Sequence, residues 1–364
     1  MQGLAQRDCV MLFSQAAHAW ITLDATAQAI WRRFDYPASI AAVTIALAAH
    51  YEAAEDDIRG DVEGAVARLL EHGLIEEQPA GDASPLRDRY LSLLKSALAN
   101  TLYPELELQI RHLEHGAGAL SGPELLRYQR DIGERMPDAL SILMAGKQNG
   151  MASARFAHTM IGLFRLTNIE RCAEAVIRQN IPGDFLEAGV CKGGAAIFMR
   201  ALQIAHGAAQ RKTWVVDSFE GVPPSDQPVD QGYDLHLEEA RLPWLACGEA
   251  AVRDHFSRYD LLDANVEFVR GWVAQSLPNA PIGPLAILRI DVDLYSSTME
   301  CLDLLYDKVS PGGYVIVDDY GLLQCCRDSV DDFRVRRGIA EPIRWIDAWG
   351  IYWRKSGPAD GLPS

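Results

Sequence analysis

Two acidic segments in the second half of the chain hold the residues best suited to bind a metal ion. The first is Leu288–Tyr295 (LRIDVDLY) and the second is Tyr314–Tyr320 (YVIVDDY). Each is a short apolar run, typical of a buried strand, that ends in aspartates. The stretch between them favours a helix over Thr298–Lys308 and a turn at Pro311–Gly313. A strand–helix–strand unit of this length predicts two adjacent parallel strands, so the aspartates would meet at one edge of a sheet.

Carboxylates that meet at such an edge suit a hard divalent cation such as magnesium, because oxygen is its preferred ligand. Ligands of open α/β sheets also bind at the carboxyl ends of the strands. A single aspartate after a strand is often only a turn former or a helix cap. Several of them on neighbouring strand ends repel one another unless a cation or a proton lies among them. The pattern therefore favours a metal or catalytic site.

A glycine-rich segment, Asp184–Gly194 (DFLEAGVCKGG), is a second candidate site, in which a strand leads into a turn and then a helix. Glycines let the backbone approach a ligand closely at a helix N-terminus. The dinucleotide fingerprint G-x-G-x-x-G is missing, and the pattern is the acidic-x-Gly-x-x-x-Gly of S-adenosylmethionine (SAM) methyltransferases. The next strand, Trp214–Val216, ends at Asp217, which could accept hydrogen bonds from ribose hydroxyls. These signals favour SAM, and a nicotinamide-dependent dehydrogenase is the alternative.

The composition excludes several classes of function. The 364 residues are 49% apolar and 23% charged, as in a globular protein, and the formal net charge is -16. That charge argues against a nucleic-acid partner, which needs basic surfaces, and disfavours anionic membranes. No apolar run reaches membrane-spanning length, and the N-terminus lacks the pattern of a signal peptide. The seven cysteines include no CxxC pair, so reduced thiols in a cytoplasmic protein are expected.

The chain is predicted to have three parts. Residues 1–78 form a small winged-helix-like α+β domain, with a hairpin of Cys9–Phe13 and Trp20–Leu23 followed by helices. Residues 79–150 form a linker and a helical segment. In residues 151–356 strands alternate with helices, which predicts an α/β fold with a doubly wound, Rossmann-like sheet. The expected strands are Phe185–Val190, Thr213–Val216, Val266–Val269, Leu285–Ile290, Tyr314–Val317 and Gly350–Arg354.

Ordered blocks over residues 85–355 carry a family resemblance. The blocks are Leu86–Lys95, Thr159–Gly162, Arg165–Asn168, Glu187–Gly194, Asp217–Pro223, Gly271–Trp272, Leu288–Thr298 and Pro311–Tyr320. They resemble the macrocin O-methyltransferase family, whose members act on sugar hydroxyls of macrolide antibiotics. The resemblance implies the class I SAM-methyltransferase fold with a helical N-terminal extension. It also implies a SAM- and magnesium-dependent O-methyltransferase.

By position, the resemblance implies a role for each matching residue. Asp291, Asp318 and Asp319 would hold Mg²⁺, and Asp291 would also be the general base. A dication lowers the pKa of a hydroxyl and orients it, and a nearby carboxylate can then take the proton. The residues implied for the SAM pocket are Met160, Glu187, Ala188, Gly189, Gly193, Asp217, Ser218, Phe219, Gly271 and Trp272.

The segment 231–256 corresponds to a lid that touches the acceptor in the family. Within it, Gly248 stands where family members usually carry serine, so the resemblance leaves the acceptor open. His236 could assist proton transfer, although a solvated surface histidine is the more ordinary interpretation. The family tends to self-associate, so a homo-oligomer is expected.

Residues 1–78 resemble a second family, the PqqD-like peptide-recognition domains. The matching segments are Thr22–Trp31, His50–Tyr51 and Asp61–Ile75. In that family a leader peptide adds as a strand to the edge of the hairpin, where backbone groups are unpaired. The resemblance implies that the strand near Cys9–Phe13 offers this edge.

The two resemblances together predict O-methylation of a ribosomally made peptide, or of a group carried on one, held by the N-terminal domain. The alternative is a sugar-hydroxyl O-methyltransferase acting on a glycosylated small molecule, in which residues 1–78 are structural. A third hypothesis, a degenerate enzyme that serves as a peptide-binding scaffold, is disfavoured by the intact carboxylates.

Overall fold

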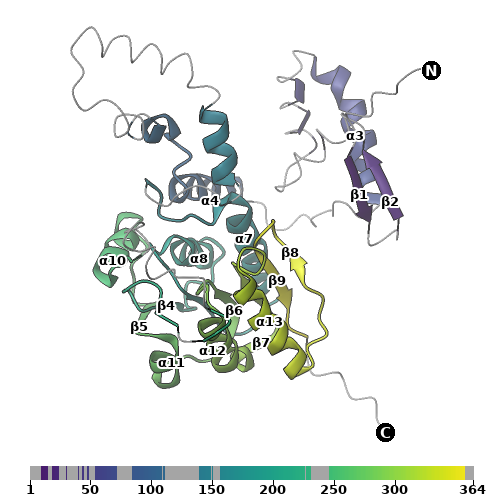
Figure 1. The fold of residues 1–364 in the computed structure, drawn as a ribbon. Coiled ribbons are helices and arrows are strands. Elements are labelled where there is room, and N and C mark those ends of the chain that lie inside the picture. Colours follow the sequence, from purple (N-terminus) through teal and green to yellow (C-terminus); the bar gives the residue numbers. More distant parts are fainter. Residues whose placement is uncertain are drawn as a thin grey trace, which may run out of the picture. The chain divides into compact units, whose positions relative to one another are not determined.

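The chain forms two compact units, Met1–Ser84 and Pro85–Ser364 (Figure 1). The computed structural model describes residues 10–14, 19–23, 30, 40, 43–44, 47–48, 54–71, 84–108, 110, 139–148, 150, 156–225, 227–230 and 246–356. The boundary between the units lies at the start of helix α4 (Pro85–Leu98), which belongs to the second unit. Each unit is therefore described by itself.

The first unit contains the expected hairpin. Strands β1 (Val10–Ser14) and β2 (Ala19–Leu23) pair antiparallel, with Val10 opposite Leu23. Helix α3 (Glu55–Glu71) buries one apolar face in a small core of the unit's own. That core comprises Ile30, Val43, Leu47, Val62, Ala65, Val66 and Leu69. The remaining parts of the predicted winged helix, His50 and Tyr51 included, lie outside the described residues.

The second unit is built on a seven-stranded sheet in the order β5-β4-β3-β6-β7-β9-β8. The strands are β3 (Asp184–Ala188), β4 (Thr213–Asp217), β5 (Val266–Arg270), β6 (Leu285–Ile290), β7 (Val309–Val317), β8 (Arg344–Trp345) and β9 (Ile351–Arg354). Strands β3 to β7 are mutually parallel, and β9 pairs antiparallel with β7 and with β8. The strand order reverses between β3 and β6, the switch point where such sheets bind ligands. The predicted doubly wound α/β sheet is confirmed, and so is the parallel pairing of β6 with β7.

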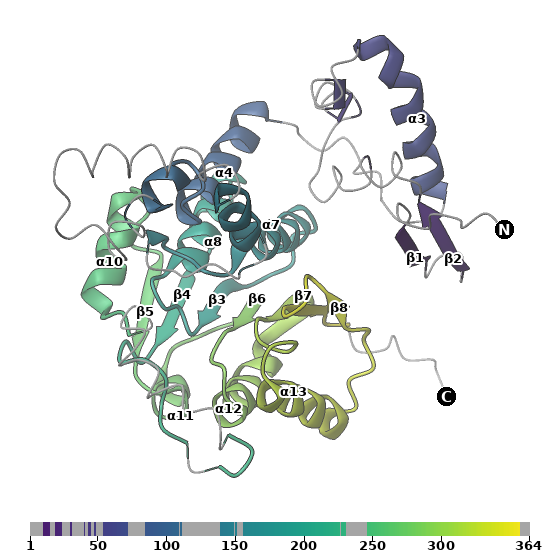
Figure 2. The same ribbon diagram turned by 45° about the horizontal axis from the view of Figure 1, so that its top comes forward.

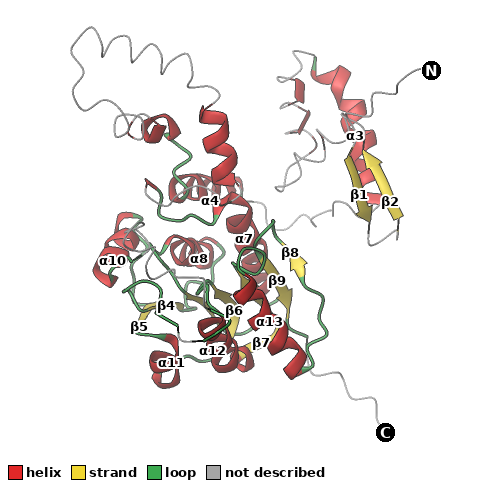
Figure 3. Cartoon of the chain, viewed as in Figure 1, coloured by secondary structure: helices red, strands yellow, loops and turns green. Residues whose placement is uncertain are grey.

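Helices cover both faces of this sheet (Figures 2 and 3). The helices are α4, α7 (Gly162–Arg178), α8 (Gly194–Ala205), α10 (Glu249–Arg258), the single turn α11 (Val273–Ser276), α12 (Tyr295–Leu305) and α13 (Gln324–Arg337). One core lies under α4, α7, α8 and α10, and the other under α12 and α13. Strands such as β6 read as continuous apolar runs because both of their faces are buried.

Two predicted elements differ from the structure. The expected turn at Pro311–Gly313 lies inside strand β7, within the register shift of its pairing with β6, where Val309 lies opposite Leu285 and Tyr314 opposite Ile287. Gly312 N–H donates to the Lys355 carbonyl and Lys355 N–H to the Gly313 carbonyl, so the end of β9 keeps this segment in the sheet. The helix expected over Thr298–Lys308 begins at Tyr295 and passes at Leu305 into a short 3-10 turn, η4 (Tyr306–Lys308).

No helix in the described part of the chain combines the length and apolar composition of a membrane span.

Candidate active site

A cavity of about 520 Å³ opens at the carboxyl ends of the parallel strands. Most of the residues predicted for cofactor and metal binding line it: Met160, Glu187, Gly189, Asp217, Ser218, Gly271, Trp272, Asp291, Asp318 and Asp319. Segments from β3, β4, β5, β6 and β7 thus contribute to one wall. The topology brings these residues together because parallel strands all end at the same edge of the sheet.

Three residues predicted for the cofactor pocket lie outside the cavity lining. The Ala188 side chain is buried in the core that faces α12 and α13. Gly193 is the N-cap of α8, and a Cβ there would approach Val252 Cγ1 to 2.7 Å. The Phe219 ring is buried against Phe268, with 6.1 Å between ring centroids. None of these three residues lines the cavity, so the prediction that they face the cofactor is not met by this structure.

Gly189 is the point where the glycine-rich loop meets the acidic segment. Its φ is +81°, and a Cβ built on it would lie 1.8 Å from the Asp291 carbonyl oxygen. Its N–H donates to the Val216 carbonyl at 2.9 Å, and Asp291 N–H donates to the Ala188 carbonyl at 2.8 Å. Only glycine fits this contact, so the residue type sets how closely the loops after β3 and β6 approach.

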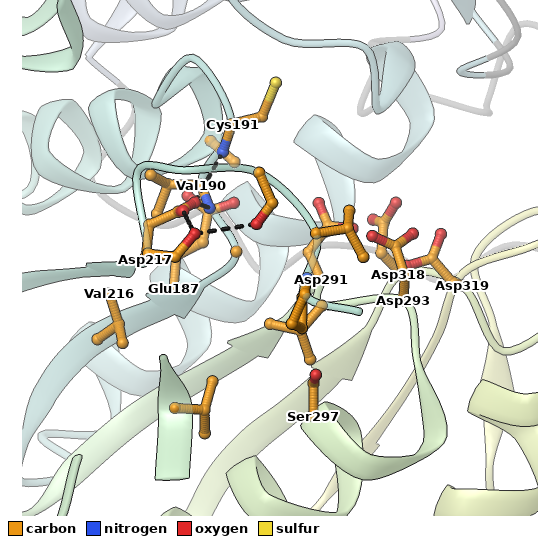
Figure 4. A pocket seen from close by; sticks show the side chains of 18 of the residues that line it. Glu187, Val190, Cys191, Val216, Asp217, Asp291, Asp293, Ser297, Asp318 and Asp319 are labelled. Atoms are coloured by element: carbon orange, nitrogen blue, oxygen red, sulfur yellow. Dashed lines mark hydrogen bonds between the residues drawn. The ribbon is translucent and has the colours of Figure 1, made fainter. Parts of the chain in front are cut away.

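Asp217 organises the glycine-rich loop (Figure 4). Its Oδ2 accepts the backbone N–H groups of Val190 at 2.7 Å and Cys191 at 3.3 Å, and its Oδ1 accepts that of Phe219 at 2.7 Å. Burial raises the pKa of Asp217, while these backbone donors act in the opposite direction. The carboxylate thereby ties the end of β4 to the turn after β3.

Four aspartates gather on the β6 and β7 side of the cavity. Asp291, Asp318 and Asp319 each offer a carboxylate oxygen, and these three oxygens lie within 4.8 Å of one another. Asp318 and Asp319 are buried. Asp293, which the sequence analysis did not select, also lines the cavity, with φ +62°, and Figure 4 shows it beside Asp318 and Asp319. The predicted triad is therefore assembled, with a fourth carboxyl beside it.

Two buried arginines, also missed from sequence, pair with this acidic group. Arg289, on β6, donates to Glu187, to Asp318 and, at 2.8 Å, to Asp291. Arg165, on α7, donates to Asp318. The signal that could have revealed Arg289 is its position in the apolar strand LAILRI, because a charge buried in a sheet must be paired.

Carboxyl groups outnumber the two arginines around the cavity. Burial raises the pKa of Glu187 to about 8 against the attraction of Arg289. Burial and the neighbouring carboxylates raise the pKa of Asp293 to about 8 and that of Asp319 well above its ordinary value. Asp319 Oδ2 is buried and has no hydrogen-bond partner among the described residues. An all-oxygen set with an unsatisfied buried carboxylate fits a hard dication.

The segment before the predicted lid is anchored by Asp230, a further residue that sequence analysis missed. Its buried carboxylate accepts the Tyr295 N–H at 2.7 Å, the Ser296 hydroxyl at 3.1 Å and the Ser225 hydroxyl at 2.7 Å. It therefore caps α12, whose N-cap residue Leu294 makes no side-chain cap. A cap supplied from 65 positions away has no local sequence signal.

Part of the predicted lid is described. Gly248 is the extended N-cap of α10, and His255 Nδ1 on that helix donates a hydrogen bond to the Lys192 carbonyl at 2.9 Å. As a carbonyl only accepts, the His255 Nδ1 must carry the proton. The His255 ring stacks on that of His158, a cavity residue, with centroids 4.3 Å apart. His236 lies outside the described residues.

Comparison with known proteins assigns both parts of the chain. Residues 87–355 match the family described as Macrocin-O-methyltransferase (TylF), and residues 9–75 match the family described as Coenzyme PQQ synthesis protein D (PqqD). One relative is the 8-demethyl-8-(2,3-dimethoxy-alpha-L-rhamnosyl)-tetracenomycin-C 4'-O-methyltransferase of Streptomyces olivaceus. It is 42% identical to this chain, over 74% of this chain and 93% of its own. Mycinamicin III 3''-O-methyltransferase of Micromonospora griseorubida is 38% identical over 73% of this chain and 96% of its own.

Two further relatives agree with this assignment. Demethyldecarbamoylnovobiocin O-methyltransferase of Streptomyces niveus is 48% identical over 55% of this chain and 76% of its own. The solved structure of the O-methyltransferase NovP is 39% identical, covers 74% of this chain and 100% of that one, and has a TM-score of 0.61. The chain carries an N-terminal PqqD domain and belongs to the macrocin O-methyltransferase family of SAM-dependent O-methyltransferases.

Proposed function

We propose that this protein is a SAM- and Mg²⁺-dependent enzyme that methylates a sugar hydroxyl on a glycosylated natural product. The observation that carries the proposal is the convergence of Asp291, Asp318 and Asp319 in the same cavity as the glycine-rich loop. The names of two relatives support the acceptor class, because one acts at the 4' oxygen of a compound that bears a rhamnosyl group and the other at the 3'' oxygen of mycinamicin III. This is the alternative of the sequence analysis, and these relatives favour it over peptide methylation.

One end of the cavity would bind the cofactor, and the other would bind the metal ion and the acceptor. Glu187, Gly189, Asp217 and Trp272 would line the cofactor end, close to the switch point of the sheet. Asp291, Asp318 and Asp319 would hold a dication, which when bound lowers the pKa of an acceptor hydroxyl and orients it. Asp291 lies at the junction of the two ends, since its backbone touches Gly189.

Asp291 would act as general base by taking the proton of the acceptor hydroxyl. Burial raises the pKa of this carboxyl, which strengthens it as a base, while the hydrogen bond from Arg289 acts in the opposite direction and orients the carboxylate. Arg289 also joins Asp291 to Asp318, so both carboxylates are held by one rigid, planar cation. Methyl transfer is then mainly a matter of alignment between the acceptor oxygen and the methyl group.

A second candidate is methylation of a peptide, or of a sugar carried on one, with the leader bound by the first unit. The specific observation in its favour is the PqqD match over residues 9–75, together with a two-stranded hairpin whose strand edges could accept another strand. In this hypothesis the chemistry at Asp291 is unchanged, and only the delivery of the acceptor differs.

Transfer of label from isotope-labelled SAM by the full-length protein tests the proposal. We expect label in demethyldecarbamoylnovobiocin or mycinamicin III, the acceptors in the names of two relatives, with added Mg²⁺ and its loss with EDTA. Magnesium in excess should restore the transfer, because carboxylate sites release the ion to a chelator reversibly. Label that enters only the peptide fraction of a producer extract, and no glycoside, would favour the second candidate.

A further inference from the structure

Trp349 lies at the far end of the cavity from the cofactor loops. It belongs to the turn between β8 and β9, and it lines the cavity together with Leu322 from the turn after β7. Along the sheet edge the order is β5, β4, β3, β6, β7 and β9. The acidic cluster on β6 and β7 therefore separates Trp349 from the glycine-rich loop on β3. An acceptor bound at the acidic cluster would extend toward Trp349.

The backbone around Trp349 is held in place by specific contacts. Gly321 N–H donates to the Trp349 carbonyl at 2.7 Å, and Asp347 Oδ1 accepts the N–H groups of Trp349 at 2.8 Å and Gly350 at 2.7 Å. A Cβ at Gly321 would lie 2.1 Å from the Ala348 carbonyl oxygen. The turn after β7 and the turn before β9 are thus packed backbone to backbone.

Arg165 links the indole to the acidic cluster. Its guanidinium lies over the Trp349 ring, 5.2 Å from the centroid, while Nε donates to Asp347 at 2.8 Å and Nη1 donates to Asp318. Its Nη2 is buried and has no hydrogen-bond partner among the described residues. Arg165 itself lines the cavity, so one buried guanidinium holds both the indole and an acidic residue of the site in place.

This arrangement fixes a half-buried indole next to carboxylates that could bind hydroxyl groups or a cation. An indole offers a broad apolar surface, and the C–H face of a pyranose ring is the apolar part of a sugar. We propose that Trp349 is the acceptor platform, on which the sugar ring packs while its hydroxyls face the acidic cluster. The inference rests on the proposed sugar-hydroxyl function and adds the residue that selects a ring-shaped acceptor.

The test uses the full chain and three variants. Trp349→Leu keeps apolar bulk without the planar ring, and Trp349→Phe restores a ring. Trp345→Ala is the matched control, because Trp345 is on the same hairpin, is 53% exposed, and contacts Tyr320 with 5.5 Å between ring centroids. KM and kcat with demethyldecarbamoylnovobiocin, and the Kd for SAM by calorimetry, are measured for each.

For Trp349→Leu we expect the acceptor KM to rise about tenfold, with kcat and the SAM Kd within about threefold of wild type. Trp349→Phe should recover most of the acceptor affinity, and Trp345→Ala should leave it unchanged. If Trp349→Leu keeps the wild-type acceptor KM, or changes the SAM Kd as much as the KM, the platform role is wrong. If wild type transfers no methyl group to any glycoside, the proposed function fails and the platform's ligand class with it.

Fluorine NMR on 5-fluorotryptophan-labelled wild-type protein keeps the inference testable if Trp349→Leu misfolds. The Trp349 resonance is identified by its absence in Trp349→Phe. We expect that resonance to shift on addition of the glycoside in the presence of Mg²⁺ and S-adenosylhomocysteine, and the Trp345 resonance to stay. A Trp349 resonance that does not respond to a glycoside the enzyme methylates would overturn the platform role.

Discussion

At the scale of single residues, the site depends on how a few buried charges are matched. Arg289 contacts carboxylates from the cofactor end and from the acidic end of the cavity, so one cation serves Glu187, Asp291 and Asp318. Asp319 keeps an oxygen without a partner among the described residues. Buried carboxylates are retained in a fold only when a cation, a proton or several hydrogen bonds compensate them. The excess of carboxylates here is what a dication would compensate.

Replacing Asp291 with Asn removes the proposed base and weakens a metal ligand while keeping the shape of the side chain. We expect kcat to fall by about 10² to 10⁴, because the amide cannot take the acceptor proton, with the SAM Kd within about threefold. Steady-state kinetics and calorimetry measure the two effects. The control is Asp332→Asn on α13, an exposed carboxylate bonded to the Tyr295 hydroxyl, which should leave both unchanged. A fully active Asp291→Asn enzyme would exclude Asp291 as the base.

At the scale of elements, helix α12 positions the acidic segment that precedes it. The helix begins at Tyr295, two residues after Asp293, so its first turn sets the path of the loop from β6. The backbone N–H groups of its first turn, which have no partner within the helix, donate to Asp230. Asp230 also accepts the Ser225 hydroxyl, and Ser225 follows the residues Val222 and Pro223 of the cavity wall. A negative charge at a helix N-terminus is favourable both as a hydrogen-bond acceptor and toward the helix dipole.

Asp230→Ala should therefore lower both stability and activity. We expect the free energy of unfolding to fall by about 1 to 2 kcal/mol, since a buried cap is lost, and kcat/KM to fall as the wall loosens. Chemical denaturation and steady-state kinetics measure the two changes. Ser225→Ala, which removes a single hydrogen bond to the same carboxylate, is the matched control and should cost clearly less. Equal effects of the two substitutions would contradict a capping role.

At the scale of the whole molecule, the methyltransferase unit spans nearly the whole length of the relatives that it matches. NovP is covered over 100% of its chain, and the Streptomyces olivaceus enzyme over 93%, by about three quarters of this one. The first unit is an addition with its own small core. A domain with its own core can in principle fold and act alone.

A chain that begins at Ser84 should keep its activity on a free glycoside. We expect kcat/KM for that acceptor within about twofold of the full-length value, because the described cavity residues all belong to the second unit. Circular dichroism confirms folding before the kinetics are compared. A folded, truncated enzyme that has lost glycoside methylation would show that the first unit takes part in acceptor binding, as the peptide hypothesis requires.

The amino-acid sequence alone was sufficient to predict the doubly wound sheet with six of its seven strands, all but β8, the parallel pair β6 and β7, and the residues at the ends of that pair. These features follow from short-range patterns: apolar runs mark strands, aspartates mark their ends, and glycines mark a close backbone approach. Family resemblance identified the enzyme class. Where local pattern failed, as at Pro311–Gly313, a pair of backbone hydrogen bonds with Lys355, at the end of β9, keeps the segment in the sheet.

Only the tertiary structure decided how the charges are matched and what faces the acceptor. Arg289 pairs with Glu187 across 102 positions, and Arg165 with Asp318 across 153. Trp349 reaches the cavity, and Asp230 reaches the start of α12, through loops whose paths depend on contacts with other elements. Such pairings depend on which segments pack together, and no periodicity within a segment encodes them. Sequence therefore determined the strand ends and the glycine-rich loop. Packing determined which arginines pair with the buried carboxylates, and it placed Trp349 at the cavity.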